Sequence, residues 1–107
     1  MLKIVETEAA IQDVIGAADY IAQYASLNTS DKFLQAVKDT YRQIADMPGI
    51  GSPRDYGQAE LQGMRFWHVT KFPQYLVFYI TTMSELRILR VLHGARDITT
   101  VFSPPEE

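Results

Sequence analysis

The sequence predicts an α+β domain in which two helices cover one face of an antiparallel sheet. The first half of the chain repeats apolar residues at helical spacing, whereas three runs after residue 63 are rich in aromatic and β-branched residues. The 107 residues are 47% hydrophobic and 21% charged, a balance typical of a globular domain. We therefore expect a single domain over residues 1–107, with a flexible acidic tail at residues 103–107.

The amino-terminal half is expected to form a short strand and then an antiparallel helical hairpin. Residues 2–5 predict the strand, and Thr7 is a natural N-cap for the first helix. A break with a fresh N-cap is expected at residues 28–31, and the Met-Pro-Gly sequence at 47–49 ends the second helix. The expected apolar stripes comprise Ile11, Val14, Ile15, Ala18, Ile21, Ala22 and Ala25, then Phe33, Leu34, Val37, Tyr41 and Ile44.

The carboxyl-terminal half is expected to form an antiparallel meander. Four glycines and a proline in residues 49–63 predict a loop with room for one short irregular strand, and Pro73 should prevent continuous pairing in the next connection. Residues 76–80 are apolar on both faces, so their strand should lie at the centre of the sheet. The sheet face away from the helices then needs a partner, a substrate or the C-terminal segment to cover it. Strands are predicted over residues 64–69, 75–81 and 86–93.

Composition excludes several classes of site. Cysteine is absent, and the two histidines, His68 and His93, lie 25 positions apart, so no compact metal-binding motif exists. We expect no metal and no cofactor. No run approaches the roughly 20 apolar residues that cross a bilayer, and the first residues do not resemble a signal peptide. The expected location is therefore the cytoplasm, with no membrane partner.

Charge is distributed unevenly along the chain. Residues 1–53 hold four basic and seven acidic side chains, whereas residues 54–96 hold six basic and three acidic ones. Such asymmetry is typical of an ordinary solvated surface or of a face for an anionic partner, and the sequence leaves both open. The pI of about 5.3 is low for a protein that binds nucleic acid. No direct sequence-specific binding to nucleic acid is expected.

Three segments of the second half carry a family resemblance. Together with the segment Ala10..Asp13-Val14 leading to Asp19-Tyr20-Ile21 in the first half, and with the order strand, two helices, Pro-Gly loop and meander, they resemble the ParE/RelE superfamily of bacterial toxins. The resemblance is to its ParE-like branch in particular and runs from about residue 2 to residue 102. The resemblance implies the RelE/ParE-like fold and a toxin of a type II toxin-antitoxin system. The three segments are Leu61-Gln62-Gly63-Met64-Arg65, Tyr75-Leu76-Val77-Phe78-Tyr79 and Ile88-Leu89-Arg90-Val91-Leu92-His93-Gly94-Ala95-Arg96-Asp97.

One branch of this superfamily consists of ribosome-dependent mRNA endonucleases of the RelE type. Such enzymes use cationic groups to stabilise phosphate charge and acid or base groups to move protons. The resemblance places Arg96 at a phosphate-contacting arginine, but Leu76 falls on a second arginine and Phe102 on a tyrosine that some of these nucleases need. If the chain is a nuclease, the implied catalytic residues are Arg65, His93 and Arg96.

The ParE-like branch acts on DNA gyrase by protein-protein contact and traps the enzyme with its DNA cut. The resemblance therefore implies a gyrase inhibitor that requires no catalytic residues, and this interpretation fits the sequence better than the nuclease does. The candidate target-binding residues are Arg65, Arg90, His93 and Arg96.

Each candidate also has a structural interpretation. Arg87 and Arg90 are three apart on a strand, so we expect them on opposite faces, with Arg87 in solvent or paired to an acidic neighbour. His93 is expected to be a hydrogen-bonded turn residue. Arg96 and Asp97 are expected to form a turn ion pair or to begin a helix.

The resemblance also implies a cognate antitoxin, encoded beside the toxin, with which the chain would form a higher-order hetero-oligomer. Tyr20 and Tyr24 on the first helix are the expected anchors, because tyrosines provide rigid, amphipathic interface area. A third interpretation is a toxin fold without poisoning activity that is retained as a binding module.

Overall fold

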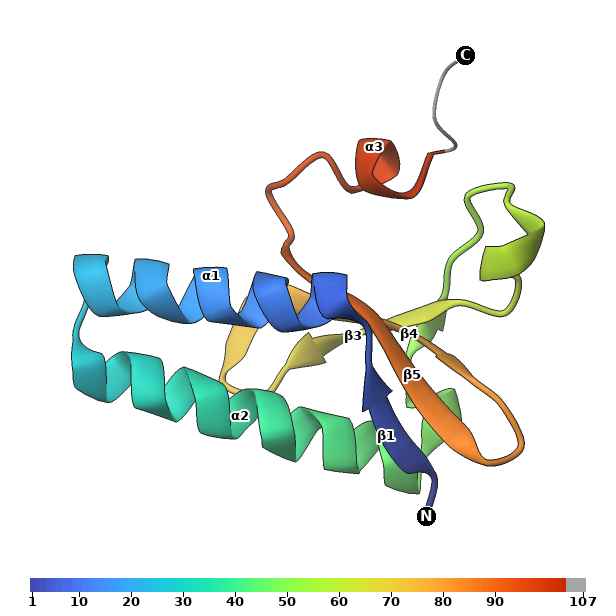
Figure 1. The fold of residues 1–107 in the computed structure, drawn as a ribbon, viewed down its shortest axis with the longest axis horizontal. Helices are drawn as coiled ribbons and strands as arrows, with labels where there is room; N and C mark the ends of the chain where they lie inside the picture. Colours follow the sequence, from blue (N-terminus) through green and yellow to red (C-terminus); the bar gives the residue numbers. More distant parts are fainter. Residues whose placement is uncertain (104–107) are drawn as a thin grey trace.

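The computed structural model describes residues 1–103, so the predicted flexible tail lies outside the described residues except for Ser103. The chain forms a five-stranded sheet with the order β1-β5-β4-β3-β2. Figure 1 shows the elements in sequence colours. They are β1 (Lys3–Glu6), α1 (Glu8–Tyr24), α2 (Leu27–Asp46), a 3₁₀ turn (Pro48–Ile50), β2 (Ser52–Pro53), a second 3₁₀ turn (Ala59–Leu61), β3 (Arg65–Val69), β4 (Phe72–Thr81), β5 (Glu85–His93) and α3 (Ile98–Phe102).

The sheet confirms the predicted α+β architecture and adds one feature to it. Strands β2 to β5 form an antiparallel meander with β4 at the centre, as the apolar residues 76–80 predict. Strand β1 joins the edge of this meander and runs parallel to β5, with Lys3 opposite Glu85 and Glu6 opposite Ile88. Because β1 is short, the second half of β5 has no neighbouring strand on that side.

The helical hairpin begins at the predicted cap but turns earlier than predicted. The Thr7 side chain accepts a hydrogen bond from the Ala10 N–H and caps α1. Ser26, rather than a residue of the predicted break at 28–31, caps α2 by accepting from the Thr29 N–H. The prediction was wrong because Ser30 lies inside the helix, where its hydroxyl donates to the Ala18 carbonyl of α1 and satisfies both groups.

The β3–β4 connection is also tighter than predicted. A two-residue turn at Thr70 and Lys71 joins the strands, and β4 begins at Phe72, ahead of Pro73. The register shifts between His68 and Val69, so Pro73 falls where the ladder to β3 is interrupted. A proline that lacks the N–H is tolerated at such an irregularity, which is why it does not prevent the strand from forming.

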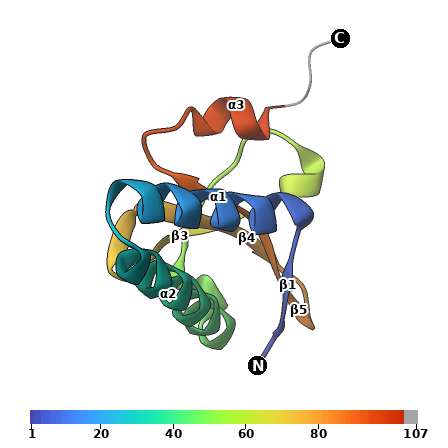
Figure 2. The same cartoon turned by 60° about the vertical axis from the view of Figure 1, so that its left-hand side comes forward.

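Apolar side chains form a separate core on each face of the sheet. The helices α1 and α2 pack on one face, around Phe33, Ile44 and Tyr79, which are almost fully buried. On the other face, Phe102 of α3 packs on Phe78 with ring centroids 5.0 Å apart, and Tyr56 of the 54–63 loop stacks on Phe102 at 5.3 Å. Figures 1 and 2 both place α3 on the opposite side of the sheet from α2. The face expected to need a cover is thus covered by the chain's own C-terminal segment.

A β-bulge in β5 changes which side chains share a face. Phe78 pairs with Arg90 and Tyr79 with Ile88, so Leu89 is the additional residue. Arg87 pairs with Ile80 and Arg90 with Phe78, and both partners belong to the core beneath α3. Arg87 and Arg90 therefore start from the same face of the sheet. The prediction of opposite faces was wrong because strict alternation fails at a bulge.

Gly51 lies where the chain after α2 crosses the end of the sheet. Its N–H donates to the Tyr79 hydroxyl at 3.0 Å, and that hydroxyl donates to the Pro48 carbonyl at 2.6 Å. A Cβ at Gly51 would lie 2.6 Å from the same hydroxyl oxygen and 2.7 Å from the Phe66 carbonyl oxygen. Only glycine fits this contact without displacing backbone.

Gly51→Ala is therefore expected to lower the free energy of unfolding by about 2 kcal/mol, as measured by urea denaturation. Gly49→Ala is the matched control, because a Cβ there meets no atom within 4 Å, and we expect a change of less than about 0.5 kcal/mol. Equal denaturation midpoints for the two variants would contradict the role assigned to Gly51.

Candidate target-binding site

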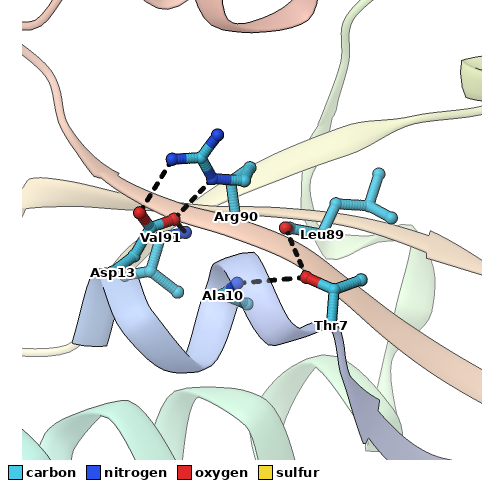
Figure 3. A network of polar contacts seen from close by, with 6 residues as sticks. All are labelled: Thr7, Ala10, Asp13, Leu89, Arg90 and Val91. Atoms are coloured by element: carbon cyan, nitrogen blue, oxygen red, sulfur yellow. Dashed lines mark hydrogen bonds and ion pairs between the residues drawn. The ribbon is translucent and has the colours of Figure 1, made fainter. Parts of the chain in front are cut away.

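The unpaired edge of β5 is held by side chains of α1. Figure 3 shows that the Thr7 hydroxyl donates to the Leu89 carbonyl and that Asp13 faces Arg90 and Val91. Asp13 accepts from the Val91 N–H at 3.0 Å and from two guanidinium nitrogens of Arg90, Nε at 2.7 Å and Nη2 at 2.8 Å. The helix thus completes the backbone hydrogen bonding that a neighbouring strand would otherwise supply.

Arg90 is fixed rather than free. Its side chain is 23% exposed and that of Asp13 is 9% exposed, and the contact is a two-point ion pair. The hydrogen bonds from Arg90 to Asp13 raise the pKa of Arg90, while partial burial acts in the opposite direction. This guanidinium positions β5 against α1, and part of it remains at the surface beside the end of the strand.

A hollow of about 320 Å³ opens next to this ion pair, where β5 ends and the chain turns towards α3. His93 and Arg96 line it from the turn, and Gln12 and Gly16 line it from α1. His93 and Arg96 are both exposed. The structure therefore brings together three of the predicted residues. His93 and Arg96 line the hollow, and Arg90 lies next to it because it pairs with Asp13, which also lines the hollow.

His93 makes a local hydrogen bond within the turn. Its Nδ1 accepts from the Ala95 N–H at 3.0 Å, and its ring packs edge-on against Tyr75 with centroids 5.1 Å apart. This matches the expectation of a hydrogen-bonded turn residue. The Nε2 atom is left as the ring nitrogen through which His93 can meet a partner.

Asp97 begins α3 rather than pairing with Arg96. Its carboxylate accepts from the Thr100 N–H at 3.3 Å and from the Thr100 hydroxyl at 2.6 Å. These hydrogen bonds lower the pKa of Asp97. The contribution of the cap to stability is therefore present above the ordinary aspartate pKa of about 3.9 and is lost as the pH falls through the lowered value. Among residues 1–103, Arg96 has no ion pair.

Arg65 lies apart from this group. It is on β3, two strands away from β5, and its Nη1 donates to the Gly51 carbonyl at 2.6 Å. Arg87 pairs with Glu85 at 3.0 Å, as expected of a residue without a binding role. The candidate site is therefore the end of β5 with its hollow, and Arg65 is not part of the same surface.

The predicted antitoxin anchors are exposed. Tyr20 is 59% and Tyr24 69% exposed, and their rings lie one helical turn apart with centroids 4.6 Å from each other. Tyr20 also borders a hollow of about 550 Å³, which lies between the tip of the helical hairpin and the start of β4. This hollow shares Tyr75 and His93 with the smaller one. The tyrosine surface and the candidate target-binding site are thus adjacent.

The positions where the resemblance places nuclease groups have packing roles. Leu76 and Phe102 both belong to the core beneath α3, and the Phe102 side chain is buried against Phe78 and Tyr56. Neither residue has a group that can donate or accept a proton. Asp13 is the acidic residue that lines the hollow, and both of its oxygens are occupied by Arg90 and Val91.

Sequence reasoning missed the two polar residues that α1 contributes to the site. Asp13 and Gln12 lie on the polar side of a helix, where they have the pattern of ordinary solvated residues. Asp13 is 77 residues from Arg90, so no local spacing signals their contact. The sequence signal at Asp13 is its place in the first-helix segment that resembles the toxin family, and this assigns it no contact.

Two absences are clear for the part of the chain that the structure describes. Within residues 1–103, no helix combines the length and hydrophobicity that a bilayer crossing requires. The same residues contain no group of three or more histidine, cysteine or acidic side chains placed to hold a metal ion.

This arrangement of a helical hairpin, a small sheet and a short C-terminal helix is the fold of the RelE/ParE-like toxins. The family model described as "ParE toxin of type II toxin-antitoxin system, parDE" matches residues 4–98. The chain therefore belongs to the ParE toxin family. No curated protein matches it significantly.

Three solved structures with the same fold illustrate the likeness. A chain of the chromosomal ParDE system from P. aeruginosa is 17% identical, with a TM-score of 0.69, over 87% of this chain and 96% of that one. A chain of the E. coli DinJ-YafQ complex is 20% identical, with a TM-score of 0.54, over 89% of this chain and 96% of that one. A YafQ mutant from E. coli is 20% identical, with a TM-score of 0.53, over 96% of this chain and all of that one. At these identities the likeness shows the fold alone.

Proposed function

We propose that this ParE-type toxin inhibits DNA gyrase in the cytoplasm by binding a conformation in which the DNA is cut. One observation carries the choice of target. Leu76 and Phe102 occupy the positions where the resemblance places a second nuclease arginine and a tyrosine, and both pack in the core beneath α3. A surface with an incomplete set of catalytic groups can still act by binding, provided that it prefers one state of its target.

The proposed contact surface is the end of β5. His93 and Arg96 line the 320 Å³ hollow, and the Asp13–Arg90 pair fixes the strand that ends at His93. Exposed cationic groups of this kind steer association with an anionic surface. We infer that Arg96 makes the principal contact, because it is exposed and, among the described residues, has no ion pair.

The test is gyrase supercoiling and DNA cleavage with the purified chain, with and without the antitoxin. Accumulation of cut DNA that the antitoxin reverses is the expected result. If a chain that circular dichroism shows to be folded changes neither supercoiling nor DNA cleavage by gyrase, the gyrase proposal is wrong for that enzyme. Growth arrest on expression, with filamentous cells and an induced DNA-damage response, is the corresponding result in vivo.

The second candidate is a ribosome-dependent mRNA endonuclease. It is favoured by the hollow that His93 and Arg96 share, because a histidine and a cation are two parts of such a site. Cleavage of mRNA on ribosomes, lost in His93→Gln, would support it over gyrase. If neither assay responds, the inactive binding module takes precedence.

We further propose that a cognate antitoxin neutralises the chain by covering the tyrosine surface and the neighbouring hollow. The two solved systems named above are described as a ParDE system and a DinJ-YafQ complex, and the present chain has the same fold. Because the 550 Å³ hollow beside Tyr20 shares His93 with the candidate site, a segment bound there would obstruct the target as well. A higher-order hetero-oligomer is the expected assembly.

Tyr20→Ala and Tyr24→Ala together are expected to weaken antitoxin binding at least tenfold, since exposed aromatic anchors dominate interfaces. Isothermal titration calorimetry measures the effect. Ile15→Ala on the same helix is the matched control, because Ile15 is 48% exposed and does not line the hollow. Unchanged affinity in the double variant would show that the antitoxin binds elsewhere.

A further inference from the structure

Lys71 has a backbone conformation that its side chain does not favour. It is the second residue of the β3–β4 turn, with φ of +68°, and it is the one residue other than glycine with positive φ within residues 1–103. Glycine has no steric cost in this left-handed region, whereas a residue with a Cβ is strained there. A residue that keeps this conformation at a cost in stability is a candidate for a role of its side chain.

The turn places Lys71 beside one of two hollows that share Phe72, and the two hollows together are called the groove. The 550 Å³ hollow beside Tyr20 and a second hollow of about 370 Å³ beside α2 are both lined by Phe72, which lies between them. Phe72 is held edge-on against the core residue Phe33, with centroids 5.2 Å apart. The first hollow is lined in part by the aromatic rings of Tyr20, Phe72 and the buried Tyr75. The second is bordered by Lys71 and by Lys32 of α2.

The lysine end of the groove carries excess positive charge. Neither Lys32 nor Lys71 has an ion pair among residues 1–103. The acidic residue of this hollow, Asp39, is already bound by Arg42 at 3.5 Å and by the Gln35 amide at 3.0 Å. Two ammonium groups are therefore available to a partner, beside an aromatic surface, on a chain whose net charge is −3.

We propose that this groove docks an acidic, amphipathic segment of the antitoxin, with an apolar side chain in the hollow lined by Tyr75 and carboxylates at Lys32 and Lys71. The inference rests on the proposed function, because it names the chemistry of the antitoxin segment and the residues that receive it. Lys71 is thus a binding residue that the fold retains at a cost in stability. The two lysines favour a segment with carboxylates, and the aromatic side chains of the first hollow provide apolar contact area.

The decisive variant is Lys71→Gly, which removes the ammonium group and the backbone strain together. We expect its thermal midpoint to rise by about 2–6 °C while the affinity for the antitoxin falls about threefold to tenfold at low salt. A higher thermal midpoint together with a lower affinity for the antitoxin would show that Lys71 acts in binding and not in folding. Lys32→Gln should weaken binding by a similar factor, and Gln74→Trp, which fills the aromatic hollow, by tenfold or more.

The probe is the purified full-length product of the neighbouring antitoxin gene, titrated calorimetrically into the purified toxin chain at two salt concentrations. Lys38→Gln is the matched control, because Lys38 is an exposed lysine of α2 that does not line the groove. If Lys32→Gln, Lys71→Gly and Gln74→Trp all bind as Lys38→Gln does, the groove is not the docking site, although the toxin-antitoxin pairing stands. If the unchanged chain does not bind the antitoxin at all, the antitoxin proposal and the groove inference both fail.

Discussion

Asp13→Ala is expected to lower the free energy of unfolding by about 3 kcal/mol. The change leaves the partly buried Arg90 guanidinium without its carboxylate and removes the acceptor for the Val91 N–H. Breaking a buried ion pair by removing one partner is strongly destabilising, because the remaining charge stays out of water without compensation. Urea denaturation followed by circular dichroism measures the effect.

Asp19→Ala on the same helix is the matched control, because Asp19 is exposed and has no hydrogen bond or ion pair among the described residues. It is expected to change stability by less than about 0.5 kcal/mol. Asp13→Asn should give an intermediate loss, since the amide oxygen still accepts from Val91 while the ion pair is lost. If Asp13→Ala and Asp19→Ala have equal midpoints, the contact between α1 and β5 adds no net stability.

The elements of the fold could be predicted because their signals are local. Thr7 caps α1 with its own side chain, and Pro48 and Gly49 directly follow the end of α2. The period of the apolar residues then distinguishes the helices from the strands of the second half. Such signals act over a few residues, and they therefore survive without knowledge of the tertiary structure.

The errors arose where a tertiary contact overrides a local preference. Ser30 has the composition of a helix cap, but its hydroxyl is used to join α2 to α1 through the Ala18 carbonyl. Pro73 disfavours a strand, but the register shift in β3 removes the hydrogen bond that it cannot make. A bulge at Leu89 likewise reverses the expected relation of Arg87 and Arg90. None of these features is visible in spacing alone.

The exposed residues of the candidate site could be predicted from the sequence, whereas the contacts that hold β5 in place could not. His93 and Arg96 follow the last strand, so the sequence already places them near each other. Arg65 belongs to the same family pattern, but the strand order separates it from the end of β5. Asp13 could not be assigned a role before β1 was known to be too short to pair with residues 89–93.

Arg96→Glu is expected to reduce gyrase poisoning about 10- to 100-fold without lowering stability. Arg96 is exposed and, among residues 1–103, has no ion pair, so reversing its charge removes no contact that supports the fold. The groups of the target that attract Arg96 would repel a glutamate at the same position. Charge reversal at the centre of an interface therefore lowers affinity more than truncation of the side chain does. The measurement is the concentration of chain that gives half-maximal DNA cleavage by gyrase, with the thermal midpoint determined in parallel.

Lys38→Glu is the matched control, because it makes the same change of net charge on an exposed part of α2, away from the hollow that Arg96 lines. If both variants lose potency equally, the overall charge of the chain determines association and no specific contact is involved. If Arg96→Glu alone loses potency and still binds the antitoxin with full affinity, the target and antitoxin surfaces are separable. The antitoxin would then neutralise the toxin because the hollow that it occupies shares His93 with the hollow that Arg96 lines. Arg96 itself would contact only the target.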